Sequence, residues 1–261
     1  PLESDSDPRA AGRRGGKVRR RLLAKRQTRQ RVVIGGLAAL AVFLGAIALG
    51  VQSLDTTLQT IVYDKALDVS PAKVKNQITI VAVDTATIKA SDVYPLPRRL
   101  YADLINALRP LNPTSISFDI SFYDKSPSPQ DDALLAAAVK DAGNVYLAMQ
   151  GAGDGTLGDH VTKFAEVELP IPELAAAAAG LGAVNITADP DSRVRDAQMV
   201  IEGPDGKRYY SLPLVAAAKQ VRADLAKARL EDGRLIIPAP LGERVLPLNQ
   251  RGGMGVYYAS A

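Results

Sequence analysis

The chain has 261 residues and a formal net charge of +4, from 32 basic and 28 acidic side chains. It contains no cysteine and one histidine, His160, which excludes disulfides, thiolate catalysis, cysteine-ligated metals and multi-histidine metal sites. No phosphate-binding P-loop, H-E-x-x-H or G-x-S-x-G motif is present, so nothing in this chain identifies it as an enzyme.

The basic residues are concentrated before residue 32. Arg9 to Arg31 holds 11 basic residues and no acid, which leaves 21 of the 32 basic and 25 of the 28 acidic residues after it, a net charge of −4. The positive charge therefore belongs to a tail and is no evidence that the large domain binds nucleic acid. No aromatic residue interrupts this tail, so we expect no nucleic-acid partner.

Residues 32–51 read VVIGGLAALAVFLGAIALGV, which is twenty residues without a charge or a proline. A helix of that length is about 30 Å long and crosses the hydrocarbon core of a bilayer. The sequence predicts an uncleaved transmembrane helix at 32–51, and basic residues 1–31 place the N-terminus in the cytoplasm and the main domain outside the inner membrane. The alternative is a cleaved signal peptide, with Ala48-Leu49-Gly50 as its cleavage site.

Small residues four apart in this span, such as Gly35 and Ala39, favour close packing of two helices, and we expect a homodimer in the bilayer. Residues 52–75 form the predicted juxtamembrane stalk. Its apolar positions from Leu58 to Val69 predict one helical face, and Ser70-Pro71 ends the helix.

The domain at 76–261 begins with alternating strand and helix patterns. Apolar, β-branched runs predict strands at 78–83, 115–122 and 144–149, the first of them buried on both faces of a sheet. Helical spacing predicts helices at 100–108 and from 130 to a cap at Gly143. This order predicts an α/β fold with a mixed, partly parallel sheet flanked by helices.

The second half of the domain is less regular. Residues 151–168 are polar and glycine-rich and predict a surface loop that serves as a ligand lid. We expect an antiparallel strand pair, 182–187 with 193–201, joined by a turn. Further elements are a short helix at 170–179, a long helix capped by Ser211 and continuing to Leu230, strands at 235–237 and 244–248, and a closing turn, NQRGG.

The order and spacing of the motifs from about Leu54 to Tyr258 resemble the CHASE2 family of extracytoplasmic sensor domains in bacterial receptors. The matching pieces are ITIVAVD, YPLPRRLYADLINAL, SISFDISF, QDDALLAAAV, PELAAAAAGLGAVNITADPDSRVR, RYYSLPLVAAA and VLPLNQRGG. In YPLPR a tyrosine stands where the family often has tryptophan. The resemblance implies a fragment of a longer receptor, with further membrane spans and a cytoplasmic output such as a nucleotide cyclase or a kinase.

Four charged residues form the first candidate ligand site. Asp84 and Asp119 lie at or near the carboxyl ends of predicted neighbouring strands, where open α/β sheets bind ligands. Arg98 and Arg99 begin the following helix and are expected to face the same crevice. Together they suit a zwitterionic or polar small molecule, and the alternative is an internal network of ion pairs and caps that holds the loops.

The second candidate group surrounds the turn at Asp189 and Asp191. These acids suggest part of a calcium loop, but the regular ligand spacing and final Glu of such a loop are missing, so a plain β-turn is favoured. Asn185 and Arg195 flank the turn and are expected either to reach a ligand or to pair with the acids. His160 lies in a polar run and is expected to be solvated. No cofactor or metal is predicted.

Two functions follow from the sequence. The first is a membrane-anchored sensor that relays an unknown small-molecule or envelope signal to a cytoplasmic output beyond this chain. The alternative is a structural dimerisation or assembly domain of a membrane protein, without a soluble ligand. An exported hydrolase is disfavoured by the single histidine and the missing nucleophile motif.

Overall fold

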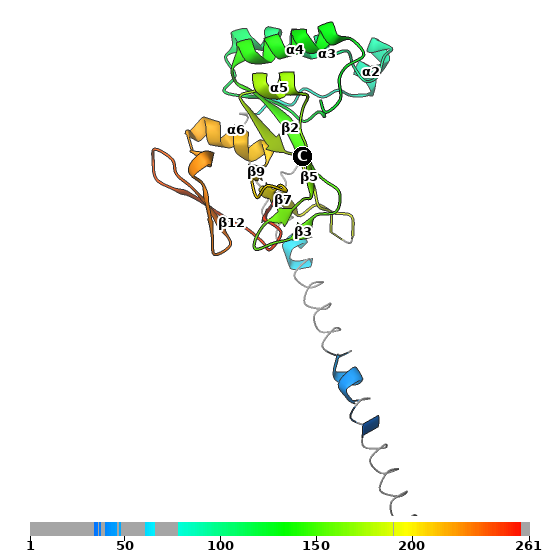
Figure 1. Cartoon of the computed structure of the whole chain (residues 1–261), viewed down its shortest axis with the longest axis vertical. Coiled ribbons are helices and arrows are strands. Elements are labelled where there is room, and N and C mark those ends of the chain that lie inside the picture. The colour runs from blue at the N-terminus through cyan, green and yellow to red at the C-terminus, as the bar shows by residue number, and fades with distance from the viewer. Residues whose placement is uncertain are drawn as a thin grey trace, which may run out of the picture. The chain divides into compact units, whose positions relative to one another are not determined.

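The computed structural model describes residues 34–35, 37, 40–45, 47, 61–65, 78–189 and 191–256 (Figure 1). The chain divides into two compact units, and the second, Lys75–Tyr257, contains every helix and strand named below. In the first unit the described residues are helical. The predicted cytoplasmic tail and most of the predicted stalk lie outside the described residues, as does part of the predicted span at 32–51. Within the described part of the chain, no helix is both long enough and apolar enough to cross a bilayer.

The central sheet of the second unit contains β1 (Ile116–Phe118), β2 (Val145–Ala152), β5 (Glu166–Glu168) and β6 (Gly180–Ala183). β1 and β6 both run parallel to β2, which lies between them, and β5 pairs antiparallel with the end of β2. The first five residues of β2 are buried on both faces of the sheet, as expected for a parallel strand covered on both sides. The predicted mixed, partly parallel α/β fold is therefore confirmed.

Three helices cover one face of this sheet: α3 (Arg98–Leu108), α4 (Pro129–Ala142) and α5 (Pro172–Ala177). They share a core with Val145 and Leu147 of β2, whereas Tyr146 and Ala148 pack with Leu212 of α6 (Leu212–Val221) on the other side. This alternation follows from the two-residue period of a strand. The predicted helices at 100–108, 130–142 and 170–179 and the predicted strand at 144–149 are confirmed to within a few residues.

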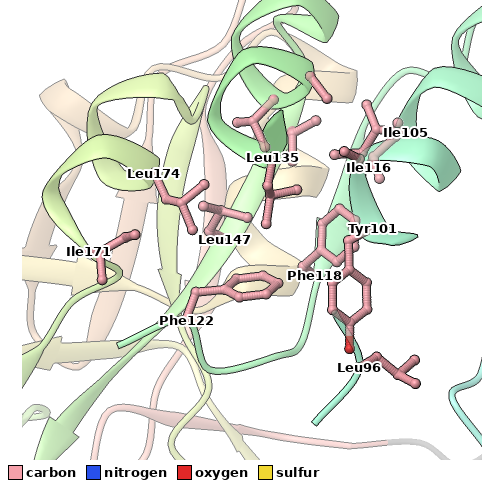
Figure 2. Packing of buried hydrophobic residues seen from close by; sticks show 14 residues of the cluster. Leu96, Tyr101, Ile105, Ile116, Phe118, Phe122, Leu135, Leu147, Ile171 and Leu174 are labelled. Atoms are coloured by element: carbon pink, nitrogen blue, oxygen red, sulfur yellow. The ribbon is translucent and has the colours of Figure 1, made fainter. Parts of the chain in front are cut away.

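An aromatic cluster lies in the core beside β1 (Figure 2). The Tyr101 ring of α3 packs edge-on against Phe118 and Phe122, with ring centroids 5.9 Å and 5.5 Å apart. Leu135, Leu147 and Ile105 are fully buried in the same core. Edge-to-face aromatic pairs contribute about 0.5–1.5 kcal/mol each beyond area burial, so this cluster fixes α3 on β1.

The caps of α4 explain where that helix begins and ends. The Ser128 hydroxyl accepts a hydrogen bond from the Asp131 amide, and Gly143 ends the helix with a φ of +67°. Asp131 and Asp132 lie in the first turn, where the helix dipole favours negative charge.

The remaining strands of this unit form three small sheets, and a second core lies among them. A four-stranded sheet holds β3 (Thr156–Leu157), β4 (Thr162–Lys163), β8 (Val200–Glu202) and β9 (Arg208–Tyr210). β7 (Asp196–Gln198) pairs with β13 (Gly253–Gly255), and β10 (Arg229–Glu231), β11 (Arg234–Ile237) and β12 (Arg244–Pro247) form an antiparallel meander. The strands predicted at 235–237 and 244–248 are confirmed.

The predicted buried strand at 78–83 is not formed in the structure. These residues form no strand, and Ile78 and Ile80 are 80% and 86% exposed. The next residues form a helix that the sequence analysis missed, α2 (Thr85–Ser91). An apolar, β-branched run shows that a segment can form a strand, but a partner must pair with it, and no described strand does.

Three predictions in the second half of the domain are also wrong. The predicted loop at 151–168 contains β3, β4 and β5, strands of two or three residues, too short to show alternation. The predicted pair 182–187 with 193–201 does not form, because β6 pairs with β2 while β7 pairs with β13. The predicted helix from Ser211 to Leu230 ends at Val221, where Arg222 adopts a φ of +54°. The 3₁₀ helix η2 (Leu225–Lys227) follows. Leu225 packs on the second core, which explains why an apolar residue stands at the position that a continued helix would also bury.

Candidate functional site

The carboxyl ends of β1, β2 and β6 meet at one edge of the central sheet, because the three strands are parallel. In open α/β sheets this edge is where ligands bind. Three polar side chains lie at these strand ends: Asp119 just after β1, Gln150 in the last part of β2 and Asn185 just after β6. Two of them, Asp119 and Asn185, were predicted as site residues.

Asp119 lies near a tyrosine that the sequence analysis missed. The Tyr123 hydroxyl oxygen is buried and meets no partner with hydrogen-bond geometry within the described residues, although the Ser121 hydroxyl is near enough to lower its pKa. Burial raises the pKa of Tyr123 and outweighs the effect of Ser121, and the negative charges of Glu168 and Asp119 raise it further. The Glu168 carboxylate accepts a hydrogen bond from the side-chain amide of Gln150. The edge thus combines two carboxylates with a neutral phenol, a set suited to a cationic or hydroxyl-bearing group.

Asn185 joins the ends of two strands. Its side-chain oxygen accepts from the Gly151 amide and its side-chain nitrogen donates to the Gly151 carbonyl, each at 2.9 Å. The amide group therefore substitutes for a backbone pair between β2 and the segment after β6. Because Gly151 engages both the oxygen and the nitrogen of this side-chain amide, the role of Asn185 is to hold the two segments together at the edge.

Arg98 is 8% exposed and is held by protein groups. Its Nη1 donates to Asp132 Oδ1 at 2.7 Å, its Nη2 donates to the Asp124 carbonyl, and the guanidinium lies 5.3 Å from the centre of the Phe122 ring. The other Asp132 oxygen accepts from the Ser126 amide. This closed network matches the alternative interpretation, in which the arginine ties α3 to α4 and to the loop after β1.

The four residues of the first predicted site are not joined to one another. Asp84 caps α2 and accepts from the amide and hydroxyl of Thr87, both at 2.8 Å, and the backbone hydrogen bond from Thr87 lowers the pKa of Asp84. Arg99 and Asp119 are exposed, and no hydrogen bond or ion pair links any two of Asp84, Arg98, Arg99 and Asp119. In the structure Asp84 does not end a strand beside Asp119, because residues 78–83 form no strand there.

The second predicted group is an ion cluster around a turn. Arg195 is 9% exposed, and its Nη1 donates to Asp189 Oδ2 at 2.8 Å and to Asp191 Oδ1 at 2.9 Å, while its Nη2 donates to Asp191 Oδ2 at 2.7 Å. The hydrogen bonds from Arg195 lower the pKa of Asp191 from 3.8 to about 2. The Ser192 amide donates to the Asp189 carbonyl, which confirms the predicted turn. Within the described residues no acidic or histidine side chains are grouped to hold a metal ion.

His160 is not solvated as predicted. Its Nδ1 lies 3.0 Å from the Asn249 carbonyl and 3.2 Å from the Leu248 carbonyl, so this nitrogen must carry a proton to donate there. A Cβ on Gly233 would lie 2.6 Å from the imidazole, which shows how closely the backbone approaches it. The histidine thus fastens the segment around 160 to the closing turn, a contact that local polarity could not reveal.

A glycine run after β2, which the sequence analysis missed, has the spacing of a dinucleotide-binding motif. Gly153, Gly155 and Gly158 match G-x-G-x-x-G, which places pyrophosphate at the start of a helix. Here the run leads into β3 and β4, so no helix begins at this position. The run forms a hairpin, in which Gly155 admits the Thr162 side chain.

The family model described as CHASE2 domain matches residues 37–261, which is most of the chain. No curated protein and no solved structure matches the chain.

Proposed function

This chain belongs to the CHASE2 family of extracytoplasmic sensor domains, and from that premise we propose that it is the membrane-anchored input domain of a bacterial signal-transduction receptor. The observation that carries the proposal is the match over residues 37–261, which spans the entire α/β unit. We propose that the output is a nucleotide cyclase or a kinase encoded beyond this chain.

The sequence before the α/β unit supports the anchor. Residues 32–51 carry no charge, and the 11 basic residues from Arg9 to Arg31 directly precede them. Basic residues beside an apolar span remain in the cytoplasm, so the net negative α/β unit belongs outside the inner membrane. The partners in this proposal are the lipid bilayer and a second copy of the chain.

A sensor must bind its signal differently in two states, since equal affinity shifts no equilibrium. We propose the carboxyl edge of the central sheet as the ligand-binding side, with Asp119 and Glu168 as charged groups and Tyr123 as a polar one. The ion pairs of Arg98 and Arg195 support this edge instead of contacting the ligand, because each guanidinium is already held by carboxylates.

One observation favours the second candidate function, an assembly domain without a soluble ligand. Large apolar side chains outside the two cores remain exposed, among them Ile78, Ile80 and Ile186. Thermal-shift screening of the unit Lys75–Tyr257 against amino acids, sugars, dicarboxylates and divalent cations separates the two candidates. Specific stabilisation by one compound class supports the sensor, because a ligand that binds the native state raises its melting temperature.

The proposed membrane topology is tested by cysteine labelling, for which the chain offers a cysteine-free background. Leu241 is 88% exposed, so a Leu241→Cys variant gives an accessible thiol in the α/β unit. We expect a membrane-impermeant maleimide to label Leu241→Cys in spheroplasts and to label Ser6→Cys, in the basic tail, only after lysis. Labelling of Ser6→Cys before lysis, or of Leu241→Cys only after it, refutes the proposed orientation.

A further inference from the structure

Residues 78–83 have the composition of a buried strand but the exposure of a loop. The run ITIVAV contains no charge, and Val81 and Val83 are 57% and 39% exposed beside the still more exposed isoleucines. A continuous apolar run of this length is typical of a strand covered on both faces. Leaving it in water forfeits roughly 1.5–3 kcal/mol for each large side chain that a sheet would bury.

The edge of β1 offers a place for such a strand. β1 pairs with β2 on one side, and no described strand pairs with it on the other. The Ile116 amide donates to the Asn144 carbonyl on the β2 side, so the backbone groups of Ser117 point to the open side. The Ser117 side chain is exposed, although Ile116 and Phe118 on the opposite face are buried.

The helices show which segment belongs at that edge. α4 connects β1 to β2, α5 connects β2 to β6, and α4 packs against both α3 and α5 on one face of the sheet. Each of these crossovers moves the chain by one strand. α3 precedes β1 and packs on it through Tyr101 and Phe118. If α3 is the crossover helix of an equivalent connection, the strand before it, residues 78–83, lies directly beside β1.

The half-covered surface of α3 agrees with this position. Tyr101 and Ile105 are buried, but Leu104 and Leu108 of the same helix are only partly buried at the border of the core. About thirty residues separate Val83 from Ile116, well above the ten to twelve that a parallel crossover needs.

We propose that residues 78–83 dock beside β1 as a fourth parallel strand beneath α3, and that the structure shows the undocked state of this segment. Residues 78–83 lie at the N-terminal end of the unit Lys75–Tyr257, so the strand is the part of the α/β unit that leads toward the proposed anchor. Docking and release change where the chain enters the unit, which couples the sensor to the membrane. That consequence rests on the proposed function, whereas docking itself does not.

Disulfide trapping in the full 261-residue chain tests the docking. Each of residues 79–82 is changed in turn to cysteine together with Ser117→Cys, and disulfide formation is followed on non-reducing gels. Alternate side chains of a strand face opposite sides of the sheet, so we expect fast intramolecular crosslinking at alternate positions. The fast pairs should form at least roughly tenfold faster than the control pair Leu241→Cys with Ser117→Cys, because docking raises the effective concentration of the two thiols.

Three outcomes overturn the proposal: rates equal to the control pair, equal rates at all four positions, and a disulfide-linked dimer, which assigns the strand to a second copy. Hydrogen exchange of the unaltered chain gives a test that needs no variant. Alternate amides within 79–83 should exchange roughly tenfold or more slowly than in an unfolded peptide, and full exchange at the unfolded rate overturns the proposal. Neither readout depends on signalling, so failure here is distinguishable from failure of the sensor function.

Discussion

Arg98 illustrates how a residue with the chemistry of a ligand contact serves the fold. A guanidinium has five donors in a rigid fork. Here Nη1 donates to the Asp132 carboxylate of α4, and Nη2 donates to the Asp124 carbonyl in the loop after β1. The sequence predicts Arg98 at a ligand site, with an internal network of ion pairs and caps as the alternative. The network is what forms, because the long side chain reaches partners 34 and 26 residues away in the chain.

Replacing Arg98 with alanine leaves the buried Asp132 carboxylate without its charge partner. We expect the free energy of unfolding of the unit Lys75–Tyr257 to fall by about 3–5 kcal/mol, as measured by urea denaturation. The double variant Arg98→Ala, Asp132→Ala should lose less, because no lone buried charge remains. Arg99→Ala, at the exposed neighbouring position, is the control and should change stability by no more than about 0.5 kcal/mol. Equal losses in Arg98→Ala and Arg99→Ala contradict this account.

Asp191 makes part of the stability depend on pH. Hydrogen bonds from Arg195 lower its pKa from 3.8 to about 2, so the folded state favours the carboxylate. This contribution is fully present above the ordinary pKa of 3.8 and is lost as the pH falls toward about 2. We expect Asp191→Asn to lower the melting temperature at neutral pH and to reduce its decline between about pH 4 and pH 2. An unchanged decline contradicts the assignment, and Asp154→Asn, at an exposed site, serves as the control.

Residue-level prediction succeeded where partners are close in sequence. Asp189 and Asp191 lie six and four positions before Arg195, and pairing of these groups is among the expectations from the sequence. The effect of the Glu168 charge on Tyr123 and the contact of His160 with the Asn249 carbonyl were not predicted. Each joins segments that are far apart in the chain, and no local pattern encodes it.

At the scale of elements, capping and helical spacing located the helices. Gly143 and Ser211 end and begin helices where the sequence analysis placed them. Strand prediction succeeded for β2, whose residues are buried on both faces, and failed for β3 and β4, which have two residues each. Short strands are held by their neighbours, so their sequences carry little periodicity.

The packing of α6 on β6 depends on a glycine in the strand. A Cβ on Gly182 would lie 2.3 Å from the Leu212 Cα, a backbone atom that cannot move without shifting α6. We expect Gly182→Ala to destabilise the unit Lys75–Tyr257 by about 1–3 kcal/mol in urea denaturation. Gly180→Ala is the matched control in the same strand, because its Cβ would meet the Tyr146 ring at 3.2 Å, and it should cost less. A larger loss for Gly180→Ala than for Gly182→Ala contradicts the close approach.

At the scale of the whole molecule, the charge distribution and the family membership agree. A basic segment precedes an uncharged run, and the α/β unit of an extracytoplasmic sensor family follows. The fold class was predictable because the strand and helix patterns alternate along the first half of the domain. The arrangement of the second half was not, because β7 and β13 pair across more than fifty residues and the sequence gives no local sign of that pairing.

The central claim is that the outer α/β unit controls a cytoplasmic output. The most direct measurement replaces residues 78–256 of the intact receptor with an unrelated monomeric domain and follows the output across ionic strength, pH and nutrient conditions. The account predicts that the output becomes insensitive to conditions that modulate the unaltered receptor, at equal amounts of both proteins in the membrane. An output that responds to every condition as before contradicts it.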